Sequence, residues 1–300
     1  MLDSLRLEAE GKTPMPESAS RSLLAVVAHP DDETFGCGGL LARYASEGVR
    51  VVLVCATRGE AGEISDPSLA TPENLGQVRE QELREAARTL GVTDLCLLGY
   101  RDSGMSGSPS NQHPEALCRA DLDRVTGQIV EIIRRVRPQV LVTFDPKGGY
   151  GHPDHIAVHK AACHAFVAAG DPSRYIELNT DGLQPHSPSR LYYFVFPRSS
   201  VHAFQAAIRA AGIESDLADI DPETMGTPDD EITTVIDVAM YKTAKEQAAR
   251  HHRTQTLGRD PFSWIPEPLR NSFLSTEHLV RAEPPFASGE PMENGIFCGI

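Results

Sequence analysis

The sequence predicts an α/β protein with a Rossmann-like fold, in which helices flank a mainly parallel sheet. Apolar runs rich in β-branched residues alternate with segments of helical periodicity, and the alternation recurs along the chain, as in successive βαβ units. The chain has 300 residues, of which 40% are hydrophobic, enough to bury the core of one large α/β domain. We therefore expect residues 1–300 to form a single domain, with peripheral tails at 1–20 and about 284–300.

Four strands and three helices are expected in the first half of the chain. The strands are the apolar runs at 23–28, 49–56, 94–99 and 140–144. Between them, apolar residues recur at helical spacing over 38–47, 75–90 and 121–136. Gly91 and Pro138 mark the ends of the second and third helices, because neither residue continues a helix readily.

The second half continues the alternation with less regular spacing. A helix is expected after His155, and the runs RLYYFVF (190–196) and ITTVIDV (232–238) are strand candidates that flank a helix at about 201–211. A last helix, from 240 to about 253, precedes a proline-rich tail, and both ends of the chain are expected to be loosely ordered. Two long loops, about 58–74 and 101–120, exceed the usual connection length and are candidates for lining a site.

Composition limits the kinds of molecule that this protein is expected to bind. The formal net charge of −14, without any run of lysine or arginine, argues against nucleic acid and anionic lipid. No apolar run reaches the roughly 18 to 20 residues that span a bilayer, so we expect a cytoplasmic protein with a small-molecule partner and no membrane association. The oligomeric state stays open, a homo-oligomer included. Six cysteines without a CxxC pair are expected to be free and mostly buried, namely Cys37, Cys55, Cys96, Cys118, Cys163 and Cys298.

A charge cluster, HPDDE at 29–33, stands at the tip of the first predicted strand. Ligands of parallel sheets bind beyond the carboxyl ends of the strands. Burying adjacent carboxylates is costly unless a cation or strong hydrogen-bond donors compensate, and a divalent metal would do so. A histidine with aspartates is a ligand set that suits zinc. Asp31 and Asp32 project in different directions, so one can bind the metal while the other faces a water. The alternative is that these acids only cap the helix that starts near Thr34.

The segment FDPKGGYGHPDHIAVH, after the fourth predicted strand, supplies further candidate ligands. A catalytic zinc site has three protein ligands and one open position. His155 and His159 could form a metal-binding pair, because residues at i and i+4 share a helix face. Alternatively, His155 binds the metal, His152 belongs to the catalytic surroundings and His159 is an ordinary helix residue.

These motifs resemble those of the zinc-dependent deacetylases of the LmbE or PIG-L type. Besides AHPDDE and GGYGHPDH, the similarity includes TRGEAGE at 57–63, YRDSGM at 100–105 and HRTQ at 252–255. It therefore covers residues 23–255. YRDSGM and GGYGHPDH are most similar to the mycothiol-pathway members, which remove acetate from N-acetylglucosaminyl-inositol.

The resemblance implies a role for each matching residue. It implies that one zinc ion per chain, or another divalent metal such as Fe²⁺, is held by His29, Asp32 and His155. It implies Asp31 as general base, His152 as the residue that stabilises the tetrahedral intermediate, and Tyr150 as a mobile tyrosine at the oxyanion. Positions expected to contact the sugar are Arg79 and Asp102.

Residues outside the metal motifs have plainer alternatives. Arg79 could be a solvated helix charge, and Asp102 a turn residue before Ser103 and Gly104. The acidic loops around Glu60, Glu63 and Asp102 would offer acceptors to sugar hydroxyls. The resemblance implies at most a bracing role for His252 and Gln255, with Thr254 in place of the more usual serine.

Other functions remain open at this point. The same zinc core would serve a mycothiol-conjugate amidase or an N-acetylglucosaminyl-malate deacetylase of the bacillithiol type. A dinucleotide-binding oxidoreductase is disfavoured, because Gly36, Gly38 and Gly39 do not match G-x-G-x-x-G and are better explained by close packing of a helix on the sheet. A metal-binding module without catalysis would need neither Asp31 nor His152.

Overall fold

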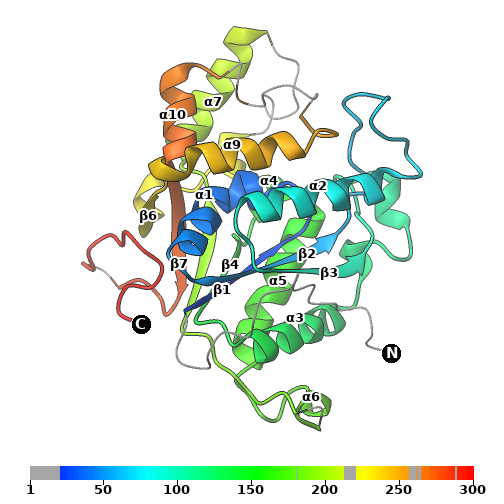
Figure 1. Cartoon of the computed structure of the whole chain (residues 1–300), viewed down its shortest axis with the longest axis vertical. Coiled ribbons are helices and arrows are strands. Elements are labelled where there is room, and N and C mark those ends of the chain that lie inside the picture. Colours follow the sequence, from blue (N-terminus) through cyan, green and yellow to red (C-terminus); the bar gives the residue numbers. More distant parts are fainter. Residues whose placement is uncertain (1–20, 181, 213–220, 257–261, 263–264, 288) are drawn as a thin grey trace.

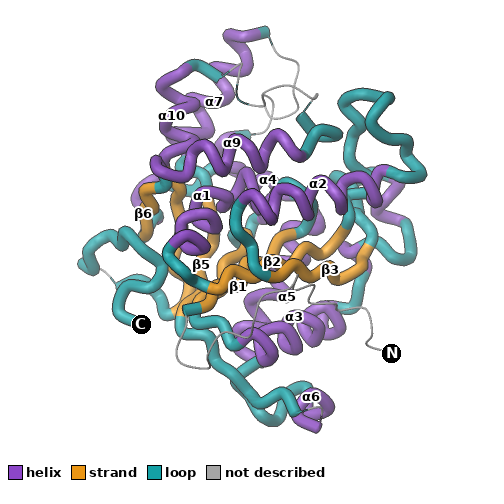
Figure 2. Tube along the Cα trace, in the orientation of Figure 1, coloured by secondary structure: helices purple, strands orange, loops and turns teal. Residues whose placement is uncertain are grey.

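A seven-stranded mixed sheet forms the centre of the protein, in the order β3-β2-β1-β4-β5-β7-β6. The computed structural model describes residues 21–180, 182–212, 221–256, 262, 265–287 and 289–300. Helices cover both faces of the sheet: α1, α2 and α9 lie on one side, and α3 and α5 on the other (Figures 1 and 2). The predicted α/β class with a mainly parallel sheet is confirmed.

Five parallel strands form at the predicted apolar runs. They are β1 (Ser22–Val27), β2 (Arg50–Thr57), β3 (Asp94–Tyr100), β4 (Val140–Phe144) and β5 (Arg190–Val195). Every residue of β1 and β4 is buried, as expected for strands covered on both faces. β1 pairs with both β2 and β4, so that Leu23 lies between Val51 and Val140. The chain order of the strands reverses at β1, which is where such sheets bind their ligands.

The longer helices agree with the predicted positions, apart from the first and the last. The first begins earlier than expected, and the last was not predicted. The longer helices are α1 (Asp32–Ser46), α2 (Leu75–Thr89), α3 (Leu122–Val136), α5 (Pro153–Ala168), α7 (Arg198–Ala211), α9 (Lys242–His251) and α10 (Glu267–Ser275). α1 begins already at Asp32 and changes direction at Cys37, whose φ of −149° is not helical. None of the described helices is long and apolar enough to cross a membrane.

Short helical turns connect these elements. They are the α-helical turns α4 (Gly148–Gly151), α6 (Ile176–Thr180) and α8 (Pro222–Met225), and the 3₁₀ turns η1 (Pro109–Gln112), η2 (Leu117–Arg119), η4 (Asp229–Glu231) and η5 (Ala239–Tyr241).

Glycines at the start of α1 let this helix approach the sheet. A Cβ atom on Gly36 would lie 2.7 Å from the ring of Phe194, and one on Gly39 would lie 2.6 Å from Val238 Cγ2. A Cβ atom at either position would force the neighbouring side chain to move, which favours glycine at both. The packing interpretation of these glycines is therefore confirmed for Gly36 and Gly39, whereas a Cβ on Gly38 would make only ordinary contacts.

The region after α9 differs from the expectation of a helix followed only by a tail. It contains α10 and the strand β7 (Thr276–Glu283), which lies antiparallel between β5 and β6 (Thr234–Asp237). β7 escapes detection because its buried positions include two charged residues, Glu277 and Arg281, which break the apolar alternation.

The expectation that the C-terminal segment is loosely ordered is wrong for residues 293–297. Ile296 and Phe297 are buried, and the Ile296 amide donates to Tyr44 Oη at 2.9 Å. Glu293 accepts from Tyr192 and from Arg281 in a partly buried network. These contacts tie the tail to the sheet. The corresponding expectation for 1–20 lies outside the described residues.

All six cysteines are free, as expected. Three of them, Cys37, Cys55 and Cys96, are buried. Cys163 is half-buried, and Cys118 and Cys298 are exposed, so burial holds for only part of the set.

Candidate metal and catalytic site

Three predicted ligands meet at the carboxyl ends of β1 and β4. His29 follows β1, Asp32 opens α1, and His155 lies in the first turn of α5. His29 Nδ1 lies 3.2 Å from His155 Nε2 and 3.5 Å from Asp32 Oδ2, while Asp32 Oδ1 lies 3.4 Å from His155 Nε2. A tetrahedral zinc ion with bonds of about 2.0 to 2.1 Å separates its ligand atoms by about 3.3 to 3.4 Å. The three residues, the ligand triangle, therefore lie at spacings close to those around a metal ion, with Asp32 facing each histidine through a different carboxylate oxygen. Two groups of ligand atoms lie within 4.8 Å of one another among the described residues, namely His29, His152 and His155, and His29, Asp102, His152 and Asp154.

Hydrogen bonds hold the outer ring nitrogens of His29 and His155, which leaves the inner nitrogens available as metal ligands. His29 Nε2 lies 3.1 Å from Asp154 Oδ2 and 3.4 Å from Asp102 Oδ1, so it carries the ring proton. His155 Nδ1 faces the Gly148 carbonyl at 3.2 Å. When these outer nitrogens carry the ring protons, His29 Nδ1 and His155 Nε2 are the atoms that would face a metal, in the arrangement typical of metal-bound histidines.

The carboxylates of the cluster favour a positive charge on His29. Burial lowers the pKa of His29, but hydrogen bonds to carboxylates, that of Asp102 first, outweigh burial and raise this pKa well above its ordinary value. Burial raises the pKa of Asp32, but the interactions with His155 and His29 outweigh burial and hold this pKa far below its ordinary value. Burial lowers the pKa of His155 to about 4. A neutral His155 among ionised carboxylates fits a divalent metal ion.

Asp31, the predicted base, has an unusual backbone conformation. Its φ is 111°, a value that side chains with a Cβ rarely adopt and that is found preferentially at functional sites. Its backbone N–H donates to Glu33 Oε2 at 2.9 Å, and its own side chain makes no capping hydrogen bond. The alternative in which these acids only cap a helix therefore does not describe Asp31. Burial raises the pKa of Asp31 to about 6, although the nearby Arg79 opposes this.

Arg79 lies beneath the site with its guanidinium fully enclosed. Only 3% of this residue is exposed, and its Nη2 donates to the Pro30 carbonyl at 2.6 Å and to Asp31 Oδ2 at 3.2 Å. Its Nη1 donates to the Gly59 carbonyl at 2.9 Å. A Cβ atom on Gly59 would lie 2.2 Å from this nitrogen, which explains the glycine in TRGEAGE. Arg79 thus contacts the predicted base; its contact with a sugar stays a prediction.

His152 and Tyr150 border the triangle. The His152 ring stands edge-on to His29, with ring centres 4.5 Å apart, and its Nδ1 accepts from the Asp154 amide at 3.1 Å. Burial, together with the charge of His29, lowers the pKa of His152. The Tyr150 ring lies 5.2 Å from that of His155, and burial raises the pKa of its hydroxyl. Both predicted residues are therefore in contact with the predicted ligands.

Asp102 connects the two long loops rather than standing free at the rim. Its Oδ2 accepts from the Ala61 amide at 3.2 Å, and its own amide donates to Glu60 Oε2 at 3.0 Å. Burial raises the pKa of Asp102, but the hydrogen bond from His29 outweighs burial and lowers it. The prediction that both long loops border the site is consistent with these contacts.

Asp154 is a site residue that the sequence interpretation missed. It is completely buried, and its Oδ2 accepts from the Ser103 amide at 2.8 Å as well as facing His29. The signal was present in GHPDH, where Asp154 stands between the two histidines.

His159 lies apart from this cluster. Its Nδ1 donates to the Phe144 carbonyl at 2.9 Å, and its ring packs against Tyr193. Of the two interpretations that the histidine spacing left open, the one with His155 and His152 agrees with the geometry.

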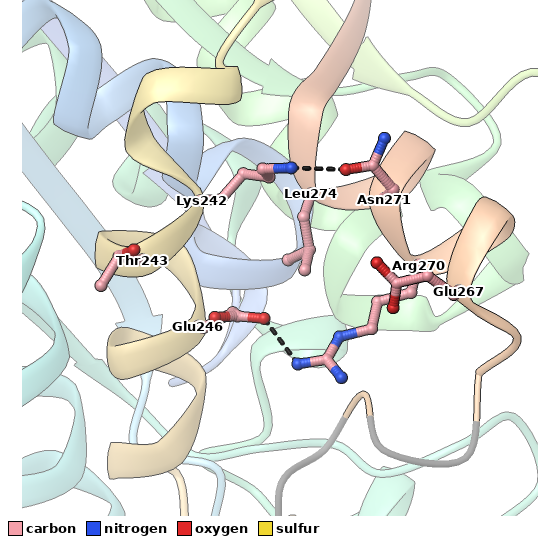
Figure 3. A pocket seen from close by; sticks show the side chains of 7 residues that line it. All are labelled: Lys242, Thr243, Glu246, Glu267, Arg270, Asn271 and Leu274. Atoms are coloured by element: carbon pink, nitrogen blue, oxygen red, sulfur yellow. Dashed lines mark hydrogen bonds and ion pairs between the residues drawn. The ribbon is translucent and has the colours of Figure 1, made fainter.

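A pocket lies between α9 and α10, away from the histidine–carboxylate cluster (Figure 3). It has a volume of about 310 Å³, and its side chains pair with one another: Arg270 with Glu246 at 2.7 Å, and Lys242 with Asn271. It contains none of the histidines of the cluster. We therefore place the functional site at the strand tips.

The mainly parallel sheet and the buried histidine–carboxylate cluster at its strand tips are typical of a metal-dependent α/β enzyme. Residues 24–166 match the PIG-L family, described as GlcNAc-PI de-N-acetylase. The 1D-myo-inositol 2-acetamido-2-deoxy-alpha-D-glucopyranoside deacetylase of Geodermatophilus obscurus is 40% identical over 295 residues, which cover 94% of this chain and 98% of that protein. The chain belongs to the PIG-L family of deacetylases, and it is an enzyme of this class.

Solved structures share the fold at lower identity. The N,N'-diacetylchitobiose deacetylase of Pyrococcus horikoshii has a TM-score of 0.62 and 23% identity, covering 87% of this chain and 84% of its own. The 4-carboxy-2-hydroxymuconate hydratase GalB of Pseudomonas putida KT2440 has a TM-score of 0.61 and 21% identity, covering 90% and 99%. Because proteins with different reactions share this fold, the fold alone does not assign the substrate.

Proposed function

We propose that this enzyme is a zinc-dependent deacetylase of an N-acetylglucosaminyl conjugate of 1D-myo-inositol, the mycothiol-type substrate. It hydrolyses the acetamide and releases acetate and a glucosaminyl product. The ligand triangle beside Asp31 is the observation that carries the reaction type. The substrate is supported by the 40% identical relative from Geodermatophilus obscurus, whose name specifies this inositol conjugate.

His29, Asp32 and His155 would hold the zinc ion through two nitrogens and one carboxylate. When bound, zinc would supply a Lewis acid that makes water more acidic and polarises the acetyl carbonyl. Asp154 keeps His29 in the required tautomer, and the Gly148 carbonyl does so for His155.

Asp31 accepts the proton of the attacking water. A pKa of about 6 suits this task, because a base is most effective when its pKa is near the working pH. Arg79 fixes the orientation of the Asp31 carboxylate through its contact at 3.2 Å. The protonated Asp31 then carries the proton that the leaving nitrogen needs. Base catalysis of this kind typically contributes about 10²- to 10⁴-fold in rate.

His152 donates a hydrogen bond to the oxyanion of the tetrahedral intermediate. Its Nδ1 accepts from the Asp154 amide, so the neutral ring carries its proton on Nε2. The lowered pKa of His152 favours this neutral form. The Tyr150 hydroxyl is a second donor, and loss of one such donor typically costs about 10²- to 10³-fold. Glu60 and Glu63 are proposed acceptors for sugar hydroxyls, whereas the contacts of Arg79 and Asp102 favour a supporting role beside substrate binding.

The test is an assay of primary-amine release by zinc-loaded enzyme on three substrates. These are the N-acetylglucosaminyl-inositol conjugate, the corresponding malate conjugate and a mycothiol S-conjugate. We expect the largest kcat/KM for the inositol conjugate. A larger value for either of the others would assign the enzyme to that sibling reaction, and no release from any of them would contradict the proposed function.

A further inference from the structure

We propose that Glu33 and His252 are positioning residues that hold the catalytic base in its active conformation. This inference rests on the proposed role of Asp31 as the base. The resemblance assigns no task to Glu33 and at most an unspecified bracing role to His252, which lies outside the 24–166 region that matches the family.

Asp31 needs an external restraint. With φ at 111°, its backbone occupies a region that a non-glycine residue leaves unless surrounding contacts hold it. The Asp31 N–H donates to Glu33 Oε2 at 2.9 Å. This bond fixes the peptide on the N-terminal side of Asp31, and with it the direction in which the carboxylate leaves the backbone.

Glu33 is itself held from the far end of the chain. The residue is completely buried, and its second oxygen, Oε1, accepts from His252 Nε2 at 2.8 Å and from Thr34 Oγ1 at 2.5 Å. His252 is also completely buried, at the end of α9, which packs against α1 and α2. Its Nδ1 has no hydrogen-bond partner among the described residues. The polar contacts of this ring therefore lie on the side of Glu33.

Docking of α9 alone does not explain the buried histidine. The neighbouring His251 already ties the end of α9 to α2, through Thr89 at 3.0 Å and Glu85 at 3.3 Å. A buried histidine–carboxylate pair contributes little stability compared with apolar side chains of similar volume. The pair instead holds the Glu33 carboxylate in place where it accepts from the Asp31 amide.

The test compares His252→Leu with His252→Gln, whose amide can still donate to Glu33. His251→Leu is the matched control, with the same substitution one residue earlier and outside the site. For each variant we would measure kcat, KM, bound zinc and the deuterium exchange of a peptide covering residues 29–34. The exchange measurement reports on the Asp31 amide and does not depend on activity.

For His252→Leu we expect kcat to fall about tenfold or more, because small misplacements of reacting groups have effects of this order. KM and bound zinc should stay within about twofold, and exchange at 29–34 should become faster. His252→Gln should restore slow exchange and most of kcat, and His251→Leu should match the wild type. Wild-type kcat and exchange in His252→Leu would overturn the proposal, as would equal losses in the Leu and Gln variants. If the wild type releases no amine, the proposed function fails, and the exchange comparison alone decides this inference.

Discussion

Burial in the folded protein disfavours the charged form of the Asp31 carboxylate. Burial raises its pKa from 3.8 to about 6, so the folded state binds the proton more tightly than the unfolded state. The stability associated with the protonated group is therefore present below about pH 4 and is lost as the pH rises to about 6. A pKa raised in this way suits the proposed base and lowers stability at neutral pH.

This linkage predicts the pH dependence of stability in metal-free protein. Relative to Asp31→Asn, which does not titrate, the wild type should lose up to about 3 kcal/mol of unfolding free energy between about pH 4 and pH 6. Urea unfolding at several pH values, with a chelator present, measures the difference. A constant difference between the two proteins across this range would contradict the raised pKa of Asp31.

The loop between β2 and α2 positions Arg79, which lies outside this loop in α2. Gly59 has a φ of +70° and packs against the Arg79 guanidinium, so the loop determines where Arg79 meets Asp31. The loop is in turn fastened to the next one by the bonds of Asp102 to Ala61 and Glu60. A side chain at Gly59 would move the arginine and disturb the base.

Gly59→Ala should therefore lower kcat more than an equally strained substitution elsewhere. We expect a loss of about 10²-fold, the order that a misplacement of about 1 Å can cause. Gly48→Ala is the control, because Gly48 has a similar φ of +81° but nothing within 4 Å of the added Cβ. Steady-state kinetics below the melting temperature of both variants measures the effect. Equal kcat values in the two variants would argue against the Gly59–Arg79 contact as the cause.

Sequence patterns located the strands that are buried on both faces of the sheet. β1 and β4 are buried throughout and appear as unbroken apolar runs, so their positions and the histidines after them could be predicted. β7 could not, because Glu277 points into the core, where it accepts from the amides of Gly39 and Leu40 and from Lys245. Such charges are acceptable only with partners brought together by the tertiary fold, which a periodic pattern does not contain.

The same distinction applies to the site. The ligand set could be proposed because two motifs stand at the tips of neighbouring strands, and the resemblance added the role of each residue. The contacts of Arg79 with Asp31 and of His252 with Glu33 could not be foreseen. They depend on how α2 and α9 dock onto the sheet, at distances along the chain that spacing does not encode.

For the whole molecule, the ligand triangle connects the segments that follow β1 and β4, so metal binding should stabilise the fold. Zinc at about 100 times its dissociation constant should add about 2.7 kcal/mol to the stability of metal-free protein. Calorimetric melting with and without zinc measures this. The stabilisation should disappear in His155→Ala and persist in His159→Ala, which removes a histidine one turn later on the same helix and outside the cluster. Loss of the zinc effect in both variants would contradict the assigned ligand set.

The C-terminal segment has a consequence for how copies of this protein meet one another. Glu293 exchanges backbone hydrogen bonds with the strand at the outer edge of the sheet: its N–H donates to the Thr233 carbonyl, and its own carbonyl accepts from the Val235 amide, each at 2.9 Å. Exposed margins of β-sheets recruit strands from other molecules and so begin polymerisation. By occupying this margin, a short stretch of the tail keeps it from serving as a template for aggregation.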